Sequence, residues 1–392
     1  MDEGKSRGSR SSGQMAHPGG IEKVIKAAVD RGASDVHIKA GDVFRARIDG
    51  QLVPLTKQRL TPEQTKAIAL RLIPSEEDQE RIDWLRDYDC SWGMPGVGRF
   101  RVNILRQRSS FMIVMRVIPF DVPSFDSLNL PVVLQAIAST EQGIVLVTGP
   151  AGSGKSSTMA AMVNHINQTA QRHIVTLESP IEFLHRDIKS SVTQREVGVD
   201  TDDYRRGLRA ALRQDPDVLL VGDLGDVAVL DTAIKAAETG HLVISAVDTP
   251  DVVTTVHRLI GMAAPQDQEG IRARLSQTLR AIVSQRLVPR ADGHGRVAAI
   301  EILIATGEVP DMIRDPERTD HLLLYVATSR EQYGMQTFDQ HLVELALAGT
   351  ITAEAAGAAA TNRAEVEAQT SGLRRRAPAP STASLSQIFP PQ

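Results

Sequence analysis

The chain has 392 residues, with 44 lysines and arginines against 48 aspartates and glutamates, and its formal net charge is -4. This length predicts two domains, and the near balance of charge gives no reason to expect a nucleic-acid partner. A single cysteine, Cys90, excludes an intrachain disulfide or a multi-thiolate metal site and is typical of a reducing compartment. No apolar run approaches the roughly 18 residues of a membrane span, so we expect a cytoplasmic protein.

The two ends of the chain differ from the rest in composition. Residues 1–18 are rich in Gly, Ser and Arg, and residues 370–392 are rich in Pro, Ser and Ala. Such segments cannot offset the entropy cost of ordering by burying apolar surface. We therefore expect both ends to be disordered tails.

A small α+β domain is predicted over residues 19–118. From Ile21 the apolar residues recur at helical spacing, and short alternating stretches then predict strands. The expected strands are 36–38, 44–48, 51–53, 99–104 and 111–118, with a second helix at about 62–73. The last two strands carry Arg on one face and apolar residues on the other. Three prolines within 119–131 make that stretch a linker, because proline cannot continue either element.

The second half, residues 132–369, alternates apolar strands with helices. Strands are predicted at 144–148, 173–177, 218–222 and 242–247, and helices include 156–168 and 227–239. This alternation predicts a parallel, doubly wound α/β sheet. After Pro265 the pattern predicts mostly helices, interrupted by one more strand at 297–305.

A phosphate-binding loop follows the first strand of this half. Residues 149–156 read GPAGSGKS and fit the Walker A pattern between a strand and a helix. Glycines let backbone N–H groups converge on phosphate oxygens, Lys155 can reach the β- and γ-phosphates, and the Ser156 hydroxyl can ligate Mg²⁺. A plain Gly-rich turn is the alternative, which the strand and helix on either side disfavour. We predict that ATP and Mg²⁺ bind here, with nucleotide contacts from Gly149, Pro150, Ala151, Gly152, Ser153, Gly154, Lys155, Ser156 and Ser157.

Three carboxylates stand where the other strands end, namely Glu178, Asp223 and Asp248. Ligands of open α/β sheets bind beyond the carboxyl ends of the strands, so these side chains are expected near the phosphates. They suit a Mg²⁺ ligand and a base that polarises the attacking water. Each could instead cap a helix or be a solvated strand end, and for Asp248, which precedes Thr249 and Pro250, capping is the favoured interpretation.

The order of these motifs resembles a known family. The Walker A loop, HIVTLESPIEF, RQDPDVLLVGD, AAETGHLV and GMQTFDQHL, preceded by GASDVHI and GRFRVN, are similar to the PilT/PilU family of type IV pilus retraction ATPases, within the wider secretion ATPases. The resemblance extends from about Ile21 to Ala364. It implies a PAS-like N-terminal domain, a RecA-like P-loop ATPase domain with a helical C-terminal part, and a homo-hexamer beneath the inner-membrane pilus platform. A PilT-type ATPase and the platform protein are the other partners it implies.

The resemblance also implies roles for individual residues. Glu178 matches the acidic-box glutamate that activates water, and Asp223 occupies the Walker B carboxylate position, where it would share Mg²⁺ with Ser156. His241 matches the first histidine of the His box, which places it with Asp248 among the residues that could sense phosphate. Arginines of the first domain match residues that approach the nucleotide when the domains close, although a solvated strand face fits each of them equally well. These arginines are Arg99, Arg101 and Arg116.

The chain departs from the family where the chemistry occurs. The family's EDP is ESP at 178–180, its GEMRD is GDLGD at 222–226, and its TLHT is AVDT at 246–249. The phosphate loop is intact, so we expect ATP binding with weak hydrolysis. TQREVG at 193–198, LVP at 287–289 and the long C-terminal tail resemble PilU more than PilT. The alternatives are a non-hydrolysing regulatory ring subunit and a type II secretion or pilus assembly ATPase.

Overall fold

The computed structural model describes residues 19–48, 50–118 and 121–371, and it divides the chain into two compact units, the second of which begins at Asp121. The tail expected at 1–18 lies outside the described residues, as does all but the start of the tail expected at 370–392. The last described helix continues to Ser371, two residues into that predicted tail.

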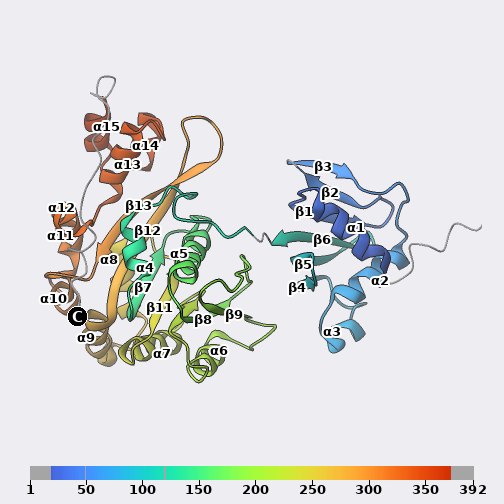
Figure 1. Cartoon of the computed structure of the whole chain (residues 1–392), viewed down its shortest axis with the longest axis horizontal. Helices are drawn as coiled ribbons and strands as arrows, with labels where there is room; N and C mark the ends of the chain where they lie inside the picture. The colour runs from blue at the N-terminus through green and yellow to red at the C-terminus, as the bar shows by residue number, and fades with distance from the viewer. Residues whose placement is uncertain (1–18, 49, 119–120, 372–392) are drawn as a thin grey trace, which may run out of the picture. The chain divides into compact units, whose positions relative to one another are not determined.

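The first unit is an α+β fold built on one antiparallel sheet (Figure 1). Its strands lie in the order β3-β2-β1-β6-β5-β4. The helices are α1 (Gly19–Asp30), α2 (Pro62–Leu72) and α3 (Glu76–Glu80), and the strands are β1 (Asp35–Lys39), β2 (Arg45–Ile48), β3 (Gln51–Pro54), β4 (Asp87–Met94), β5 (Gly98–Gln107) and β6 (Ser110–Ile118). The predicted α+β class is confirmed.

Alternation along the long strands explains the two faces of this sheet. On β5, Phe100 and Val102 are buried whereas Arg101 between them is exposed, as a side-chain period of two requires. Strand β4 was not predicted, although its sequence DYDCSWGM alternates polar residues with Tyr88, Cys90 and Trp92, which pack against the core.

The second unit is a doubly wound α/β fold. Its sheet contains β7 (Gly143–Thr148), β8 (His173–Glu178), β9 (Ser191–Glu196), β10 (Val218–Val221), β11 (Leu242–Val247), β12 (Leu279–Pro289) and β13 (Arg296–Ile304). The helices up to β12 are α4 (Val133–Ala138), α5 (Lys155–Thr169), α6 (Tyr204–Ala211), α7 (Val227–Glu238), α8 (Val252–Gly261), the short η1 (Pro265–Asp267) and α9 (Gln268–Thr278). The remaining ones are α10 (Val309–Arg314), η2 (Thr319–His321), α11 (Leu322–Thr328), α12 (Arg330–Tyr333), α13 (Phe338–Leu347), α14 (Ala353–Ala359) and α15 (Arg363–Ser371).

The strands of this sheet lie in the order β13-β12-β7-β11-β10-β8-β9. All neighbouring strands are parallel except the pair β12 and β13. Helix α5 packs on β7 and β11 with α4 beside it, and α7 packs on the same two strands beside α6 and α9. The parallel sheet therefore has helices on both faces, as the alternating sequence pattern predicted.

Two strands of this sheet were not predicted. The segment after Pro265 was expected to be mostly helical, but β12 is an eleven-residue strand between β7 and β13. Its buried polar residues, Ser284 and Gln285, interrupt the apolar run that identifies an internal strand. The second missed strand, β9, lies at the sheet edge, where the polar sequence SVTQRE gives no apolar signal.

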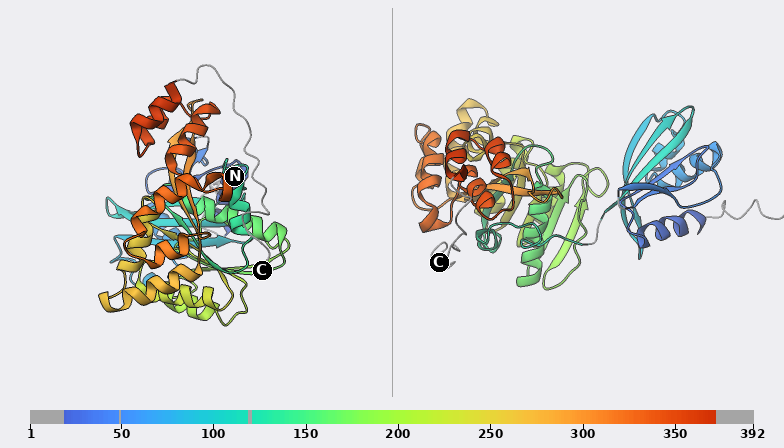
Figure 2. Two further views of the ribbon diagram at one scale, coloured as in Figure 1. Left: turned by 90° about the vertical axis from the view of Figure 1, so that its left-hand side faces the viewer. Right: turned by 90° about the horizontal axis from the view of Figure 1, so that it is seen from above.

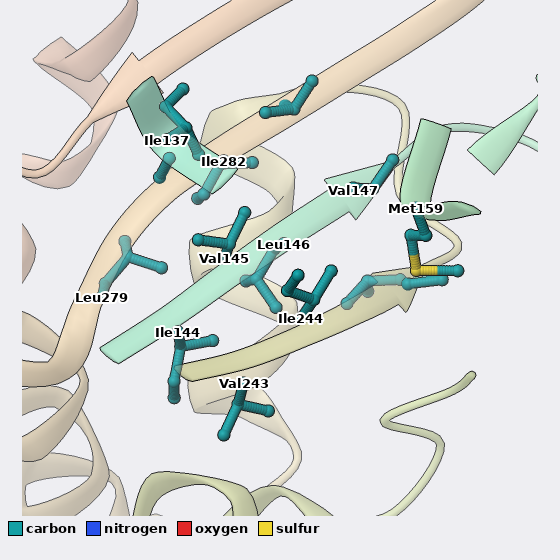
Figure 3. Packing of buried hydrophobic residues seen from close by; sticks show 14 of the residues in the cluster. Ile137, Ile144, Val145, Leu146, Val147, Met159, Val243, Ile244, Leu279 and Ile282 are labelled. Carbon is teal, nitrogen blue, oxygen red and sulfur yellow. The ribbon is translucent and has the colours of Figure 1, made fainter. Parts of the chain in front are cut away.

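Figure 3 shows the packed interior of the second unit, where side chains of β7, β11 and β12 meet those of α4 and α5. Val145, Ile244 and Ile282 are fully buried there. Phe125 and Leu130 are also buried in this core, so residues 121–131 of the expected linker pack with the second unit.

The C-terminal helices α10 to α15 gather beside the β13 edge of this sheet (Figures 1 and 2). Helices α13 to α15 form a smaller core cluster with β12 and β13, which includes Phe338, Leu342 and Val366, whereas the buried residues of α10 and α11 join the main core. The guanidinium of Arg286 on β12 lies 3.9 Å from the centre of the Phe338 ring. Among the described residues, no helix combines the length and the hydrophobicity that crossing a bilayer requires.

We predict that Ile244→Ala lowers the free energy of unfolding of the second unit by about 2–5 kcal/mol, because it leaves a cavity between the central strands. Leu324→Ala is the control, since that side chain is 67% exposed and its loss should change stability by less than about 0.5 kcal/mol. Urea denaturation followed by circular dichroism measures both. Equal effects of the two substitutions would contradict this account of the core.

Candidate functional site

The phosphate loop joins the fully buried strand β7 to helix α5. Three of its glycines have positive φ angles, 149° at Gly149, 76° at Gly152 and 92° at Gly154. A Cβ atom on Gly149 would stand 2.5 Å from both the Gln285 carbonyl oxygen and the Ser153 Oγ. The loop conformation therefore requires glycine at 149 on steric grounds as well as for its φ angle.

Lys155 is the cation of this loop. Its ammonium donates hydrogen bonds to the carbonyl oxygens of Gly149 (2.9 Å) and Pro150 (3.1 Å), and it lies 2.7 Å from Asp248 Oδ1. Ser156 follows it in the first turn of α5, where the helix dipole and backbone N–H groups favour an anion. The loop thus presents the groups expected of a phosphate site.

Asp248 follows β11 directly and lies beside the loop. Val247 pairs with Thr148 in the β7–β11 ladder, so Asp248 continues past the strand next to Gly149. The favoured expectation that Asp248 caps a helix is wrong. The N-cap of α8 is Asp251, whose carboxylate accepts a hydrogen bond from the Thr254 amide, while Asp248 pairs with Lys155.

Asp223 follows β10, the next strand along the sheet. Partial desolvation raises its pKa above the ordinary value and the charge of Asp248 adds to the rise, whereas Arg258 and Lys155 oppose it. A Cβ atom on Gly225 would stand 2.7 Å from Asp223 Oδ2. The absence of a side chain at 225 therefore leaves the space that the Asp223 carboxylate occupies.

Glu178 ends β8, and two polar neighbours orient its carboxylate. Oε1 accepts a hydrogen bond from the Thr176 hydroxyl at 2.6 Å and another from the Gln194 amide at 3.1 Å. Thr176 precedes it by two residues and so lies on the same face of β8, whereas Gln194 comes from β9. The unpredicted edge strand thus supplies one of the groups that hold this candidate base.

The strand order places these groups in a row. The carboxyl ends of β7, β11, β10 and β8 are consecutive, and they carry the phosphate loop, Asp248, Asp223 and Glu178. Neighbouring strands lie about 4.8 Å apart, so β8 is about 14 Å from β7 at the level of the backbone. Asp248 is therefore the carboxylate nearest the loop, and Glu178 is the most distant.

Gln285 is a site residue that sequence reasoning missed. It is buried on β12, its amide donates to the Ser153 carbonyl oxygen at 2.7 Å, and its side-chain oxygen accepts from the Thr158 hydroxyl at 2.9 Å. These bonds fix the loop and the first turns of α5 to the neighbouring strand. The only sequence signal for this role was that polar residues occur in a segment that was predicted to be helical.

Tyr204, at the start of α6, was also missed. Its hydroxyl stands 2.8 Å from the position that a Cβ atom on Gly222 would take. Desolvation first, and then the charges of Asp223 and Glu178, raise its pKa to about 12. The phenol therefore keeps its proton at neutral pH and lies close to both carboxylates as a neutral group.

The structure does not bring His241 to the phosphate loop. It precedes β11 at the amino end of the strand, and its Nδ1 bonds to the Ala236 carbonyl oxygen near the end of α7. A strand of six residues is about 20 Å long, so this end is remote from the carboxyl edge. The phosphate-sensing role of His241 stays a prediction.

The three candidate arginines lie in the first unit. Arg101 and Arg116 are cross-strand partners on β5 and β6, and Arg116 Nε lies 3.1 Å from Asp35 Oδ1. Arg99 is on the same face of β5 as Arg101, two residues before it. Their approach to a nucleotide stays a prediction.

The expected Mg²⁺ site depends on oxygen donors around the loop. No group of three or more His, Cys, Asp or Glu side chains in the described part of the chain is arranged to hold a metal ion. The Ser156 hydroxyl and the Asp223 carboxylate are hard oxygen donors of the kind that Mg²⁺ prefers, and Mg²⁺ in such sites takes other ligands from phosphates and water. The donor set fits a magnesium ion that arrives with the nucleotide.

Comparisons with known proteins identify related chains. Residues 14–370 match the family described as type II/IV secretion system protein. The chain is 39% identical over 337 residues to the type IV pilus ATPase PilU of Pseudomonas aeruginosa, covering 85% of this chain and 87% of PilU. It is 37% identical over 334 residues to PilT, the pilus retraction ATPase of the same organism, covering 85% and 96%. A crystal structure of the pilus retraction motor PilT with bound ADP matches with a TM-score of 0.79 and 41% identity, covering 89% of this chain and 99% of that one.

We predict that Gln285→Leu weakens binding of a non-hydrolysable ATP analogue about tenfold or more. The substitution leaves the Ser153 carbonyl and the Thr158 hydroxyl without their partner, at a cost of about 1–3 kcal/mol, and about 1.4 kcal/mol corresponds to tenfold in affinity. Calorimetry measures the affinity. Gln277→Leu, at an exposed position on α9, is the control and should bind normally. Unchanged affinity in Gln285→Leu would show that the loop holds its shape without this brace.

Proposed function

We propose a nucleotide cycle for this site. Its premise is that the chain belongs to the type II/IV secretion system proteins, and within them to the PilT/PilU pilus retraction ATPases. The chain is a P-loop ATPase whose hydrolysis of ATP drives or assists type IV pilus retraction in twitching motility. The observation that carries this function is the intact loop with Lys155 at the same sheet edge as Glu178 and Asp223.

ATP binding begins at the loop. Backbone N–H groups of residues 149–156 surround the β-phosphate, and Lys155 exchanges its present oxygen partners for oxygens of the β- and γ-phosphates. Ser156 and Asp223 would hold Mg²⁺ directly or through water, and the bound ion would supply positive charge beside the phosphate oxygens.

Hydrolysis requires a water molecule in line with the γ-phosphorus. Glu178, held by Thr176 and Gln194, polarises this water and accepts its proton. The water oxygen forms a bond to phosphorus while the bond to the β-phosphate oxygen breaks, which leaves ADP and inorganic phosphate. Because β8 is distant from the loop, Glu178 acts through the water and does not touch the phosphate.

The site also explains why turnover should be slow. Asp223 is one C–C bond, about 1.5 Å, shorter than the family's glutamate, and a misplacement of about 1 Å at a catalytic group costs on the order of 10²-fold in rate. That loss corresponds to about 2.7 kcal/mol of barrier. Asp248 adds a negative charge and occupies Lys155. Both features lower the expected rate of hydrolysis.

We also propose the setting of this activity. The chain assembles as a homo-hexamer at the cytoplasmic face of the inner membrane, where it works with the pilus platform protein and a PilT-type ATPase. Support for this assembly comes from the match to a retraction motor across both units of the chain. A ring subunit that binds ATP without hydrolysing it is the second candidate, and the Asp248–Lys155 pair is the observation that favours it.

We predict that Lys155→Ala weakens ATP binding at least tenfold, because the loop then lacks its cation and a charge-assisted contact to phosphate is worth about 1.5–3 kcal/mol. Calorimetry with a non-hydrolysable analogue measures the change. Lys235→Ala on α7, which removes an exposed lysine from the same unit, is the control. Normal binding by Lys155→Ala would refute the assignment of the nucleotide site.

We predict low but measurable ATPase activity, which Glu178→Gln abolishes and the paired reversion Asp223→Glu with Asp248→His raises. The reversion restores the length of the Walker B carboxylate and removes the charge beside Lys155. Phosphate release on purified protein measures all three rates. If the unmodified chain already turns over as fast as a relative with intact motifs, or the reversion leaves the rate unchanged, this explanation of slow turnover fails. No phosphate release in the unmodified chain and in the reversion would support the non-hydrolysing ring subunit.

A further inference from the structure

Arg258 lies near the nucleotide site but belongs to none of the motifs. It occupies the last turn of α8, its side chain is exposed, and its guanidinium forms no hydrogen bond or ion pair within residues 19–48, 50–118 and 121–371. An open groove of about 550 Å³ runs beside it, lined among others by Gly225, Asp248 and His257. An arginine and the carboxylate that contacts Lys155 therefore line the same groove.

Nucleotide binding requires Asp248 to move. Its carboxylate lies 2.7 Å from the Lys155 ammonium, which is the group that must contact phosphate. The Asp248 side chain is 72% exposed whereas that of Lys155 is 12% exposed, so the carboxylate is the partner with freedom to turn away. Once displaced, it would remain at the end of β11, between the phosphates and Asp223.

The displaced carboxylate needs a cation. Asp248 and Asp223 already repel each other, and, after desolvation, the charge of Asp248 raises the pKa of Asp223. Arg258 is the positive group that most strongly opposes this rise. The other basic side chain lining the groove, His257, has its Nε2 2.7 Å from Asp320 Oδ1. Gly225 has no side chain that could separate the groove from Asp223. Arg258 is thus the unpaired cation on the surface that Asp248 shares.

We propose that Arg258 is a positioning residue that receives the Asp248 carboxylate when nucleotide takes Lys155. The carboxylate leaves Lys155 and pairs with Arg258 across the groove. ATP binding therefore does not leave Asp248 as an unpaired charge beside the phosphates. This inference rests on the proposed binding of nucleotide by Lys155. The planar guanidinium fork suits the contact, because it can bind a carboxylate through two parallel hydrogen bonds.

A double-mutant cycle on the full chain tests the exchange, with the affinity for a non-hydrolysable ATP analogue and Mg²⁺ measured by calorimetry. We expect Arg258→Gln to weaken binding about fivefold when Asp248 is present, and by less than about twofold in the Asp248→Asn background, because coupled charged neighbours give non-additive effects. Asp248→Asn alone should strengthen binding, since Lys155 is then released without a competing charge. Arg258→Lys, which keeps the charge, should retain most of the affinity.

Arg314→Gln is the matched control, because Arg314 is also an exposed arginine in the last turn of a helix and does not line the groove. It should leave the affinity unchanged. A purely structural role for Arg258 at the α8 terminus would instead lower the thermal stability and weaken binding equally in both Asp248 backgrounds. That equal loss, or no loss in either background, would overturn the inference. Normal binding by Lys155→Ala would overturn the proposed function itself, which separates the two failures.

Discussion

The register between β7 and its neighbours is the constraint on which the nucleotide site depends. Val247 pairs with Thr148, whereas Val221, at the end of β10, pairs with Ser245, two residues before the end of β11. The strands therefore end at similar heights, and the loop and the three carboxylates emerge at one edge. Parallel strands in this order require right-handed crossovers through helices, so the covering helices and the site arise from the same topology. Gln285 then adds the bonds that fix the loop on this edge.

Much of this arrangement could be predicted from sequence, for physical reasons that differ between its parts. The four central strands are apolar on both faces because helices cover both, so they are recognisable without neighbours. The Walker A loop is recognisable because phosphate geometry restricts it to glycines, one lysine and one hydroxyl residue. The strand-end rule then located Glu178 and Asp223, although their roles remain predictions.

The rest depends on tertiary contacts that no local pattern encodes. Ser284 and Gln285 look polar along the chain, yet their strand is internal, because its polar groups bond to the neighbouring strand and loop. His241 belongs to a motif that the family resemblance places near phosphate, but it precedes its strand and so lies at the end of the sheet away from the phosphate loop of the same chain. Asp248 fits a capping pattern, but Asp251, three residues later, is the N-cap of α8. Asp248 instead forms an ion pair with Lys155.

Strand β12 links the phosphate loop to the C-terminal helix α13. Successive residues of a strand face opposite sides, so Gln285 contacts the phosphate loop while Arg286 lies over the Phe338 ring of α13. β12 pairs with β7 as far as Ser284 and with β13 as far as Pro289, so the β13 ladder holds both Gln285 and Arg286. A displacement of the loop that keeps the Gln285 bonds must therefore move Arg286 with it. Mechanical load on the C-terminal helices would in this way be transmitted to the phosphate-binding backbone through β12.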